Sequence, residues 1–255
     1  MPEIEFHQLS TAGSDRAPNQ DAVGSWPLRD GLVFAVADGI GTEGIGQLAS
    51  THALKVLARE LRAAGPDWPL LKCLRRGVQA ANLELYEKGV TVPDLRRIAT
   101  TLTATAVVGA SLVTAHVGDC RLWLLRDGRL TQLTKDHTWA QPQRPGAGSS
   151  EQAPVHARRY SLPRCLGQEL IVSIDFLSMD LQAGDVLAQS SDGVHARLEE
   201  NEIKALLEAH PPEAACHELV RRAQERDGQD DASVQVAVVR RLPDAGVRRW
   251  WGLER

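Results

Sequence analysis

Short apolar runs and longer stretches with helical spacing alternate along this chain of 255 residues. Apolar runs bounded by turn residues predict strands over 4–9, 21–25, 32–37, 100–108, 112–117, 121–125, 130–133, 170–176, 185–189 and 233–239. Apolar residues three and four positions apart predict helices over roughly 46–64, 68–88, 199–209 and 212–226. The chain therefore mixes both element types in blocks.

The order of these blocks is strands, two helices, strands, two helices and a final strand. Connections between the strands of 100–134 are too short for helical crossovers, so these strands are expected to be antiparallel. One α+β domain with two sheets packed face to face and helices outside accounts best for this order. We place the domain at 1–241, with a flexible Pro-, Gly- and Ser-rich loop over 141–160 and a tail over 242–255.

Composition narrows the class of protein. Hydrophobic residues make up 43% of the chain and charged residues 24%, which is typical of a soluble domain. The net charge of -4 and the lack of a basic stripe argue against nucleic-acid binding. No apolar run is long enough for a membrane helix, and the acidic start is not a secretory signal. Four widely spaced cysteines, without a CxxC pair, predict a reduced, cytoplasmic protein.

Acidic residues recur where predicted strands end. They occur in the segments 19–21, 37–39, 117–119, 191–193 and 230–233. An isolated Asp-Gly at a strand end is most often an ordinary turn. Several such carboxylates that converge would repel one another, and a hard divalent cation would reverse that penalty. The set as a whole therefore predicts an oxygen-ligand metal centre in an enzyme.

These segments, read in order, resemble the motifs of one family, the metal-dependent (PPM-type, or type 2C) Ser/Thr protein phosphatases. The resemblance covers about residues 7–240 and is closest to bacterial single-domain members. It rests on RAPNQD at 16–21, ADGIG at 37–41, TTLT at 100–103, VGDCR at 117–121, LTKDH at 133–137, QSSDGV at 189–194 and DDAS at 230–233. The resemblance implies an α-β-β-α sandwich of two antiparallel sheets flanked by helix pairs.

The resemblance also implies a two-metal site at one edge of the paired sheets. In that site Asp38 bridges both ions and the carbonyl of Gly39 binds one of them. Asp192 and Asp230 complete the first ion's ligands. Oxygen ligands favour Mn²⁺ or Mg²⁺ over zinc.

Three further residues take supporting roles by the same resemblance. Asp21 acts near the two ions, through a water molecule. Asp119, with Asp192, matches the ligands of the third, weaker metal ion that bacterial members often carry. Arg16 holds the substrate phosphate, for which its planar guanidinium is suited because it donates bidentate hydrogen bonds.

The expected reaction is hydrolysis of phosphoserine and phosphothreonine by a water that bridges two metal ions. Two cations offset the charge that develops on the phosphoryl oxygens and ionise the attacking water near neutral pH. Asp38, Asp192, Asp230 and Arg16 are the catalytic set. No covalent intermediate is required, so Cys120 is expected to be a packing residue. Asp136-His137 is expected to fix a turn.

Several positions depart from the family pattern, among them Gln20, where many members have Glu, and Thr42 and Glu43, which replace a more usual Gly-His pair. Ile40 stands where many eukaryotic members have a histidine that is proposed as general acid. Asp231 stands where Asn is common, and its added charge beside Asp230 would either tighten or disturb metal binding.

The 141–160 loop falls where the family has a flap beside the site, which suggests a role in choosing phosphoprotein substrates.

The function that follows is an active protein phosphatase, a monomer that opposes a Ser/Thr kinase by acting on phosphorylated proteins. The alternative is a pseudophosphatase or regulatory binding module with the same fold. The complete aspartate set favours the enzyme, because degenerate members tend to lose metal ligands.

Overall fold

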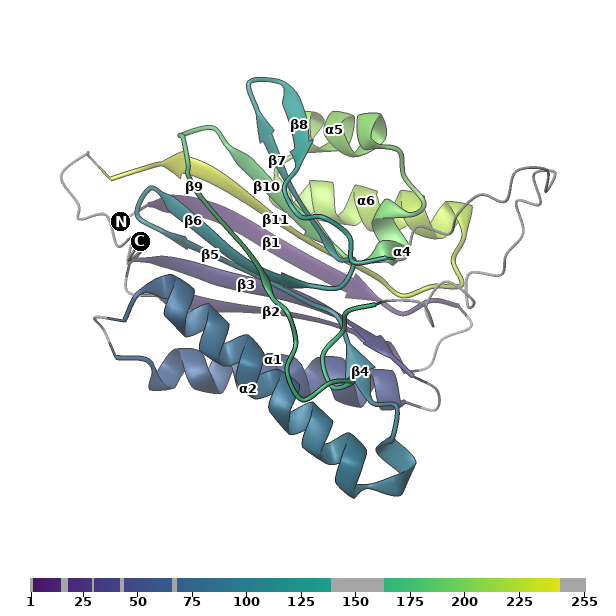
Figure 1. The fold of residues 1–255 in the computed structure, drawn as a ribbon. Coiled ribbons are helices and arrows are strands. Elements are labelled where there is room, and N and C mark those ends of the chain that lie inside the picture. The colour runs from purple at the N-terminus through teal and green to yellow at the C-terminus, as the bar shows by residue number, and fades with distance from the viewer. Residues whose placement is uncertain are drawn as a thin grey trace, which may run out of the picture.

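A computed structural model describes residues 2–14, 18–28, 30–41, 44–65, 68–138 and 163–243. Two antiparallel sheets stack on each other in this part of the chain (Figure 1). The first sheet has the strand order β1 (Glu3–Thr11), β11 (Ala232–Arg241), β10 (Val186–Ser190), β7 (Arg121–Arg126), β8 (Arg129–Gln132). The second has the order β2 (Asp21–Leu28), β3 (Gly31–Ile40), β5 (Leu102–Val108), β6 (Ser111–Val117), β9 (Asp175–Asp180), and β4 (Ala99–Thr100) pairs with the end of β3.

Helix pairs cover the outer faces of the two sheets (Figure 1). Helices α1 (Ile45–Ala63) and α2 (Leu70–Thr91) lie on the second sheet, and α5 (Glu200–Ala209) and α6 (Pro212–Arg226) lie on the first. A single turn, α4 (Asp192–His195), follows β10, and a short 3-10 helix, η1 (Pro93–Leu95), follows α2. The predicted α-β-β-α sandwich is therefore confirmed. None of the helices in the described ranges has the length and apolarity that a bilayer crossing requires.

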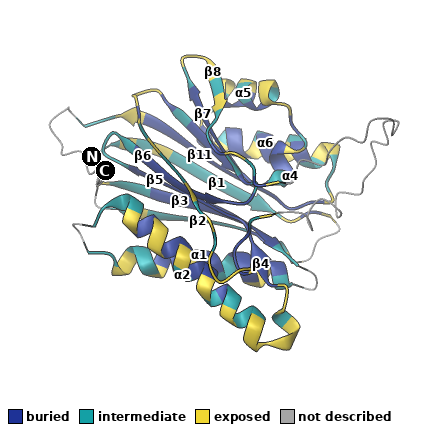
Figure 2. Ribbon diagram, viewed as in Figure 1, coloured by how far each residue is buried: buried dark blue, intermediate teal, exposed yellow. Residues whose placement is uncertain are grey.

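Alternation along the strands divides the core into layers. On β3, Val33 and Ala35 pack against the α1–α2 side, whereas Phe34 between them belongs to the cluster between the sheets. This follows from the two-residue period of a strand, which sends neighbouring side chains to opposite faces. Figure 2 shows the strands buried between helices whose outer faces are exposed. Both faces of each central strand are thus covered, which explains their continuous apolar runs.

A buried polar network joins the two sheets across their interface. The Gln189 amide donates to the carbonyl of Thr103 and to Gln235 Oε1, at 3.0 and 3.1 Å, and its own oxygen accepts from the Thr105 hydroxyl at 2.7 Å. Gln189 and Gln235 are opposite each other on β10 and β11, and both are fully buried. Buried polar groups that are satisfied in this way fix the relative position of the layers.

One predicted strand is wrong. The apolar residues of 170–176 do not form a strand until Asp175, where β9 begins, and Leu170 and Ile171 are 57% and 79% exposed. The preceding loop is held by α2 instead, because the Asn82 amide donates to the carbonyls of Glu169 and Leu170. The other predicted strands and the four long helices are present, whereas α4 and η1 were not predicted. The whole 141–160 loop and most of the tail lie outside the described residues, in the ranges 139–162 and 244–255.

Candidate metal centre

The ends of β2 and β3 bring two aspartates together. Asp21, the first residue of β2, lies directly opposite Asp38 in the antiparallel register, and both are about 5–6% exposed. The main chain of Asp38 is held on both sides, because its N–H donates to Thr101 Oγ1 at 2.9 Å and its carbonyl accepts from the Thr100 hydroxyl at 2.8 Å. The Gly39 N–H donates to the carbonyl of Gln20 at 3.0 Å. The Asp38-Gly39 pair is therefore fixed by its neighbours in the second sheet.

Close backbone packing explains the glycine after Asp38. A Cβ atom at Gly39 would lie 1.9 Å from the carbonyl oxygen of Gly46, at the start of α1. Only a residue without a side chain allows the strand end and the helix start to approach this closely. Gly39 of the ADGIG motif is therefore required for the packing of β3 against α1, apart from any role as a metal ligand.

The first sheet supplies residues to the same edge through β10 and β11. Ser191 follows β10, and its hydroxyl donates to Asp21 Oδ2 at 2.6 Å. It is held in turn by Ser233 at the start of β11, whose N–H donates to Ser191 Oγ at 3.1 Å. Asp192 is the first residue of α4, and Asp230 lies two residues before β11 and is 5% exposed. The paired sheets therefore place the ends of four strands at one edge.

The Asp21 carboxylate is in an environment that suits a cation. Its Oδ1 atom is buried and has no hydrogen-bond partner among the described residues. The pKa of Asp21 is raised to about 8, chiefly by burial and also by the charges of Asp192 and Asp231, whereas hydrogen bonds with the hydroxyls of Ser191 and Ser233 lower it. A carboxylate desolvated among other acids is stabilised in its charged form by a divalent cation. The residues present thus fit the metal that the sequence predicted.

Asp119 approaches this edge from a turn after β6. Gly118 has φ +111°, which a residue with a side chain rarely adopts. The Gly118 N–H donates to His137 Nδ1 at 3.0 Å, and the His137 N–H donates back to the Gly118 carbonyl at 2.8 Å. The other ring nitrogen of His137 faces Asp175 at 3.1 Å. His137 therefore holds the turn that carries Asp119, in agreement with the predicted turn-fixing role of the Asp136-His137 pair.

The Cys120 thiol lies close enough to three of the aspartates for their charges to affect its pKa. Burial raises the pKa of this thiol well above its ordinary range, and the negative charges of Asp38, Asp119 and Asp21 raise it further. Its sulfur lies 3.2 Å from the Thr101 hydroxyl. A thiol held in its protonated form is a poor nucleophile, so Cys120 is a packing residue, as predicted.

Asp231 has a role that its sequence position did not reveal. Its two carboxylate oxygens accept backbone N–H groups, from Gly13 at 3.0 Å and from Gln20 at 2.8 Å, and the residue is 1% exposed. Its own N–H donates to Asp230 Oδ1 at 2.8 Å. Asp231 thus fastens the segment before β2 to the start of β11. The only sign of this role in the sequence was that position 231 carries an acid, beside Asp230, where Asn is common in the family.

The predicted phosphate ligand cannot be placed. Arg16 lies in 15–17, outside the described residues, as do Thr42 and Glu43 beside the ADGIG motif. The described part of the centre therefore consists of carboxylates together with the backbone and hydroxyl groups that hold them.

The chain is similar in sequence to known protein phosphatases. The family model for protein phosphatase 2C matches residues 11–210. The serine/threonine protein phosphatase PstP of Mycobacterium tuberculosis is 34% identical over 238 residues, which cover 92% of this chain and 45% of PstP. The chain therefore spans about half the length of that relative. The serine/threonine phosphatase stp of Listeria monocytogenes is 33% identical over 202 residues, covering 77% of this chain and 80% of stp.

A solved structure extends the comparison to three dimensions. The catalytic domain of PstP in complex with two manganese ions superimposes with a TM-score of 0.77 and 31% identity. The alignment covers 92% of this chain and 97% of that domain. Since the family model covers most of the chain and the fold agrees, this chain belongs to the protein phosphatase 2C family.

Proposed function

We propose that the chain is a metal-dependent phosphatase that hydrolyses phosphoserine and phosphothreonine in proteins. One observation carries the proposal: buried aspartates from both sheets meet at one edge, where Asp21 keeps a buried oxygen without a hydrogen-bond donor among the described residues. The two manganese ions in the PstP catalytic domain support metal binding in this fold. Mn²⁺ or Mg²⁺ is the proposed cofactor, because the donor set consists of oxygen atoms.

The proposed roles are those that the resemblance to the family implies. Asp38, Asp192, Asp230 and the Gly39 carbonyl would hold the two ions, with Asp38 shared between them. Three residues support this core: Asp21 through a water molecule, Asp119 with Asp192 at a third and weaker ion, and Arg16 at the substrate phosphate.

When bound, the ions would supply a water of lowered pKa as the nucleophile and would offset the charge on the phosphoryl oxygens. The chain's own residues supply the rigid setting. Thr100 and Thr101 fix the main chain of Asp38, and Ser191 orients Asp21. Such positioning provides much of the catalysis in phosphoryl transfer, since the transition state needs charge placed in advance. Asp38, Asp192, Asp230 and Arg16 form the proposed catalytic set.

The biological setting completes the proposal. Phosphorylated proteins are the substrates, a Ser/Thr kinase is the opposing enzyme, and the protein acts as a cytoplasmic monomer in signalling. PstP and stp bear names that describe serine/threonine phosphatases, which supports this substrate class. The 141–160 loop is proposed to select among phosphoproteins.

Phosphatase assays test the proposal directly. Hydrolysis of p-nitrophenyl phosphate and of phosphothreonine peptides is measured with Mn²⁺, with Mg²⁺ and with EDTA. We expect activity with either ion, its loss in EDTA, and a decrease of about 100-fold or more in Asp192→Ala. Asp127→Asn is a matched control, because Asp127 sits in an exposed turn at φ 50°, which asparagine tolerates. A wild type that is inactive with every metal would instead support the pseudophosphatase.

A further inference from the structure

A second set of metal-ligand side chains lies on the outer side of the first sheet. His7 on β1 and Glu213 and His217 on α6 place their ligand atoms within 4.8 Å of one another. We propose that these three residues bind a divalent transition-metal ion of the zinc type, at a site separate from the acidic centre. This is the one such group of three or more among the residues in the described ranges.

The two elements aim the side chains at a common point. Glu213 and His217 are four residues apart on α6, so they project from the same face of the helix. His7 reaches them from β1, and its ring centroid lies 5.9 Å from that of His217, with 37° between the ring planes. Two imidazoles on one zinc ion, with Zn–N bonds of about 2.0–2.1 Å, place their ring centroids roughly 5–6 Å apart. The two rings therefore already have the spacing of a shared ion.

The backbone around the three residues is held in place. His7 is paired with Val236 in the β1–β11 ladder, and its carbonyl accepts from the thiol of Cys216, the residue before His217, at 3.5 Å. Pro212 begins α6 just before Glu213 and is buried. In a filled tetrahedral zinc site the ligand atoms are about 3.3 Å apart. The ligand atoms here lie within 4.8 Å of one another, so they would have to approach by up to about 1.5 Å to bind one ion. Rotation of exposed or half-exposed side chains can supply this without moving either element.

The donor set selects the metal. Two imidazoles and one carboxylate suit Zn²⁺, Ni²⁺ or Cu²⁺, whereas Mg²⁺ prefers oxygen ligands only. Three protein ligands leave a further position for water. The acidic centre has the opposite preference, since its described side-chain ligands are carboxylates. The two sites are therefore distinguished by their chemistry.

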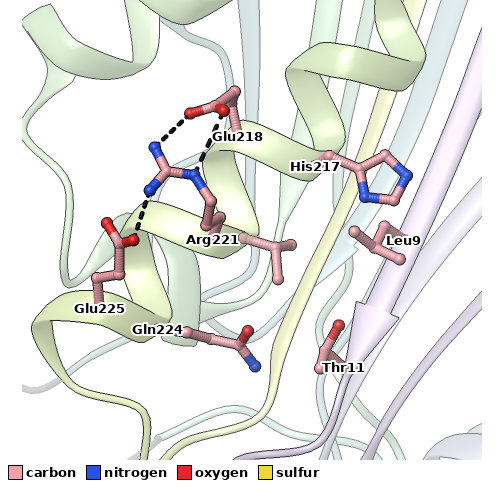
Figure 3. A pocket seen from close by; sticks show the side chains of 8 residues that line it. Leu9, Thr11, His217, Glu218, Arg221, Gln224 and Glu225 are labelled. Carbon is pink, nitrogen blue, oxygen red and sulfur yellow. Dashed lines mark hydrogen bonds and ion pairs between the residues drawn. The ribbon is translucent and has the colours of Figure 1, made fainter.

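The surroundings separate these three residues from the acidic centre. His217 stands at one end of a shallow groove of about 600 Å³ between β1 and α6 (Figure 3). Along its rim Arg221 pairs with Glu218 and Glu225, and Arg222 also pairs with Glu218, so the charges of these four side chains balance. His7 precedes Ser10 by three residues, about 10 Å along the strand, and Ser10 contacts Ser233 beside the acidic centre. An ion bound by His7 and the two α6 residues would therefore link α6 to the edge strand β1, at a distance from the acidic centre.

Zinc titration in saturating Mg²⁺ tests this site. Binding of Zn²⁺ is measured by calorimetry, and the imidazole nitrogens of His7 and His217 are followed by ¹⁵N NMR. We expect one more bound Zn²⁺ in the wild type than in His217→Gln, with shifts at both rings. Loss of a direct ligand should weaken this binding at least as much as the 10- to 100-fold seen when a hydrogen-bond partner of a ligand is lost. Glu213→Gln is the second variant, and it should weaken binding while preserving the helix.

His52→Gln is the matched control. His52 also lies beside a glutamate, with Nε2 at 3.0 Å from Glu84, but it belongs to no group of three ligands among the described residues. This variant should bind Zn²⁺ as the wild type does. Mg²⁺-dependent phosphatase activity should be unchanged in His217→Gln and Glu213→Gln, which separates this proposal from the proposed function. Equal Zn²⁺ stoichiometry in the wild type and His217→Gln, or unshifted His7 and His217 rings, would overturn the site.

Discussion

The Ser191 hydroxyl donates a 2.6 Å hydrogen bond to Asp21 Oδ2 across 170 residues of sequence. Ser191 follows β10 of the first sheet, whereas Asp21 begins β2 of the second. The bond is buried, so it joins the two sheets where the aspartates meet. Because the pKa of Asp21 is raised to about 8, its carboxyl is largely neutral in the metal-free protein at neutral pH, where such a hydrogen bond is worth about 0.5–1.5 kcal/mol. Once a cation keeps the carboxylate ionised, the bond is worth about 1.5–3 kcal/mol.

Ser191→Ala should therefore lower the free energy of unfolding of the metal-free protein by about 0.5–1.5 kcal/mol and weaken Mn²⁺ binding. The reason is that Asp21 would lose a donor that stabilises its ionised form. Urea denaturation and Mn²⁺ calorimetry measure the two effects. Ser178→Ala serves as the control, because Ser178 is an exposed serine on β9, the edge strand of the second sheet. Unchanged Mn²⁺ affinity in Ser191→Ala would show that the bond is only structural.

Asp231→Asn should destabilise the protein by about 1–3 kcal/mol. The two Asp231 oxygens accept N–H groups from Gly13 and Gln20, and an amide can present only one oxygen to them. One backbone donor would then face the amide NH₂ in a buried setting. Denaturation midpoints in urea provide the measurement, with the exposed Asp180→Asn as the control. Equal midpoints for the wild type and Asp231→Asn would contradict the fastening role.

Asp21→Asn should stabilise the metal-free protein and reduce its response to Mn²⁺. Asp21 is buried with an unpartnered oxygen near the charges of Asp192 and Asp231, so the metal-free protein must either protonate this carboxyl or bear the cost of a buried charge, and asparagine removes both costs. The amide oxygen can still accept from Ser191. Tm is measured in EDTA and in excess Mn²⁺ for both proteins, and the wild type should show the larger rise. A larger rise in the variant would rule out a role for Asp21 near the ions.

Two buried histidines, His116 and His195, should each contribute a loss of stability as the pH drops below about 6.5, opposite in sign to the contribution of Asp21. Burial lowers the pKa of His116 to about 4 and that of His195 to about 3. Above pH 6.5 both side chains are neutral in the folded and unfolded states, so they add no pH dependence. Below it the unfolded chain takes up protons that the folded chain excludes, and stability is lost until the folded pKa is reached.

The expected slope is up to about 1.4 kcal/mol per pH unit for each histidine. Urea denaturation of the wild type and of His116→Gln between pH 7 and 4 measures this effect. The variant should start less stable, because His116 contacts Thr103 and the Lys135 carbonyl, but its stability should fall less steeply with acid. Parallel slopes would exclude His116 as a source of the pH dependence.

The sequence by itself determined the element order, the sandwich and the family. The apolar run 32–37 that ends at Asp38-Gly39 is a local pattern, and β3 carries it as predicted. The other acidic motifs were also visible, because each follows or precedes a strand whose period can be read within a few residues. The strand expected at 170–176 does not begin until Asp175, because the residues before it lie in a loop that is bound by Asn82. The carbonyls that Asn82 contacts, of Glu169 and Leu170, are 87 and 88 residues away from it in the chain.

Only the tertiary structure decided which polar groups meet. The role of Asp231 depends on Gly13 and Gln20, more than 200 residues away, and the approach of His7 to His217 depends on α6 packing across β1. Periodicity describes which face a residue occupies, but hydrogen bonds and ligand groups depend on how whole sheets and helices are stacked. The residues around the aspartates could therefore be assigned only after the two sheets were placed together.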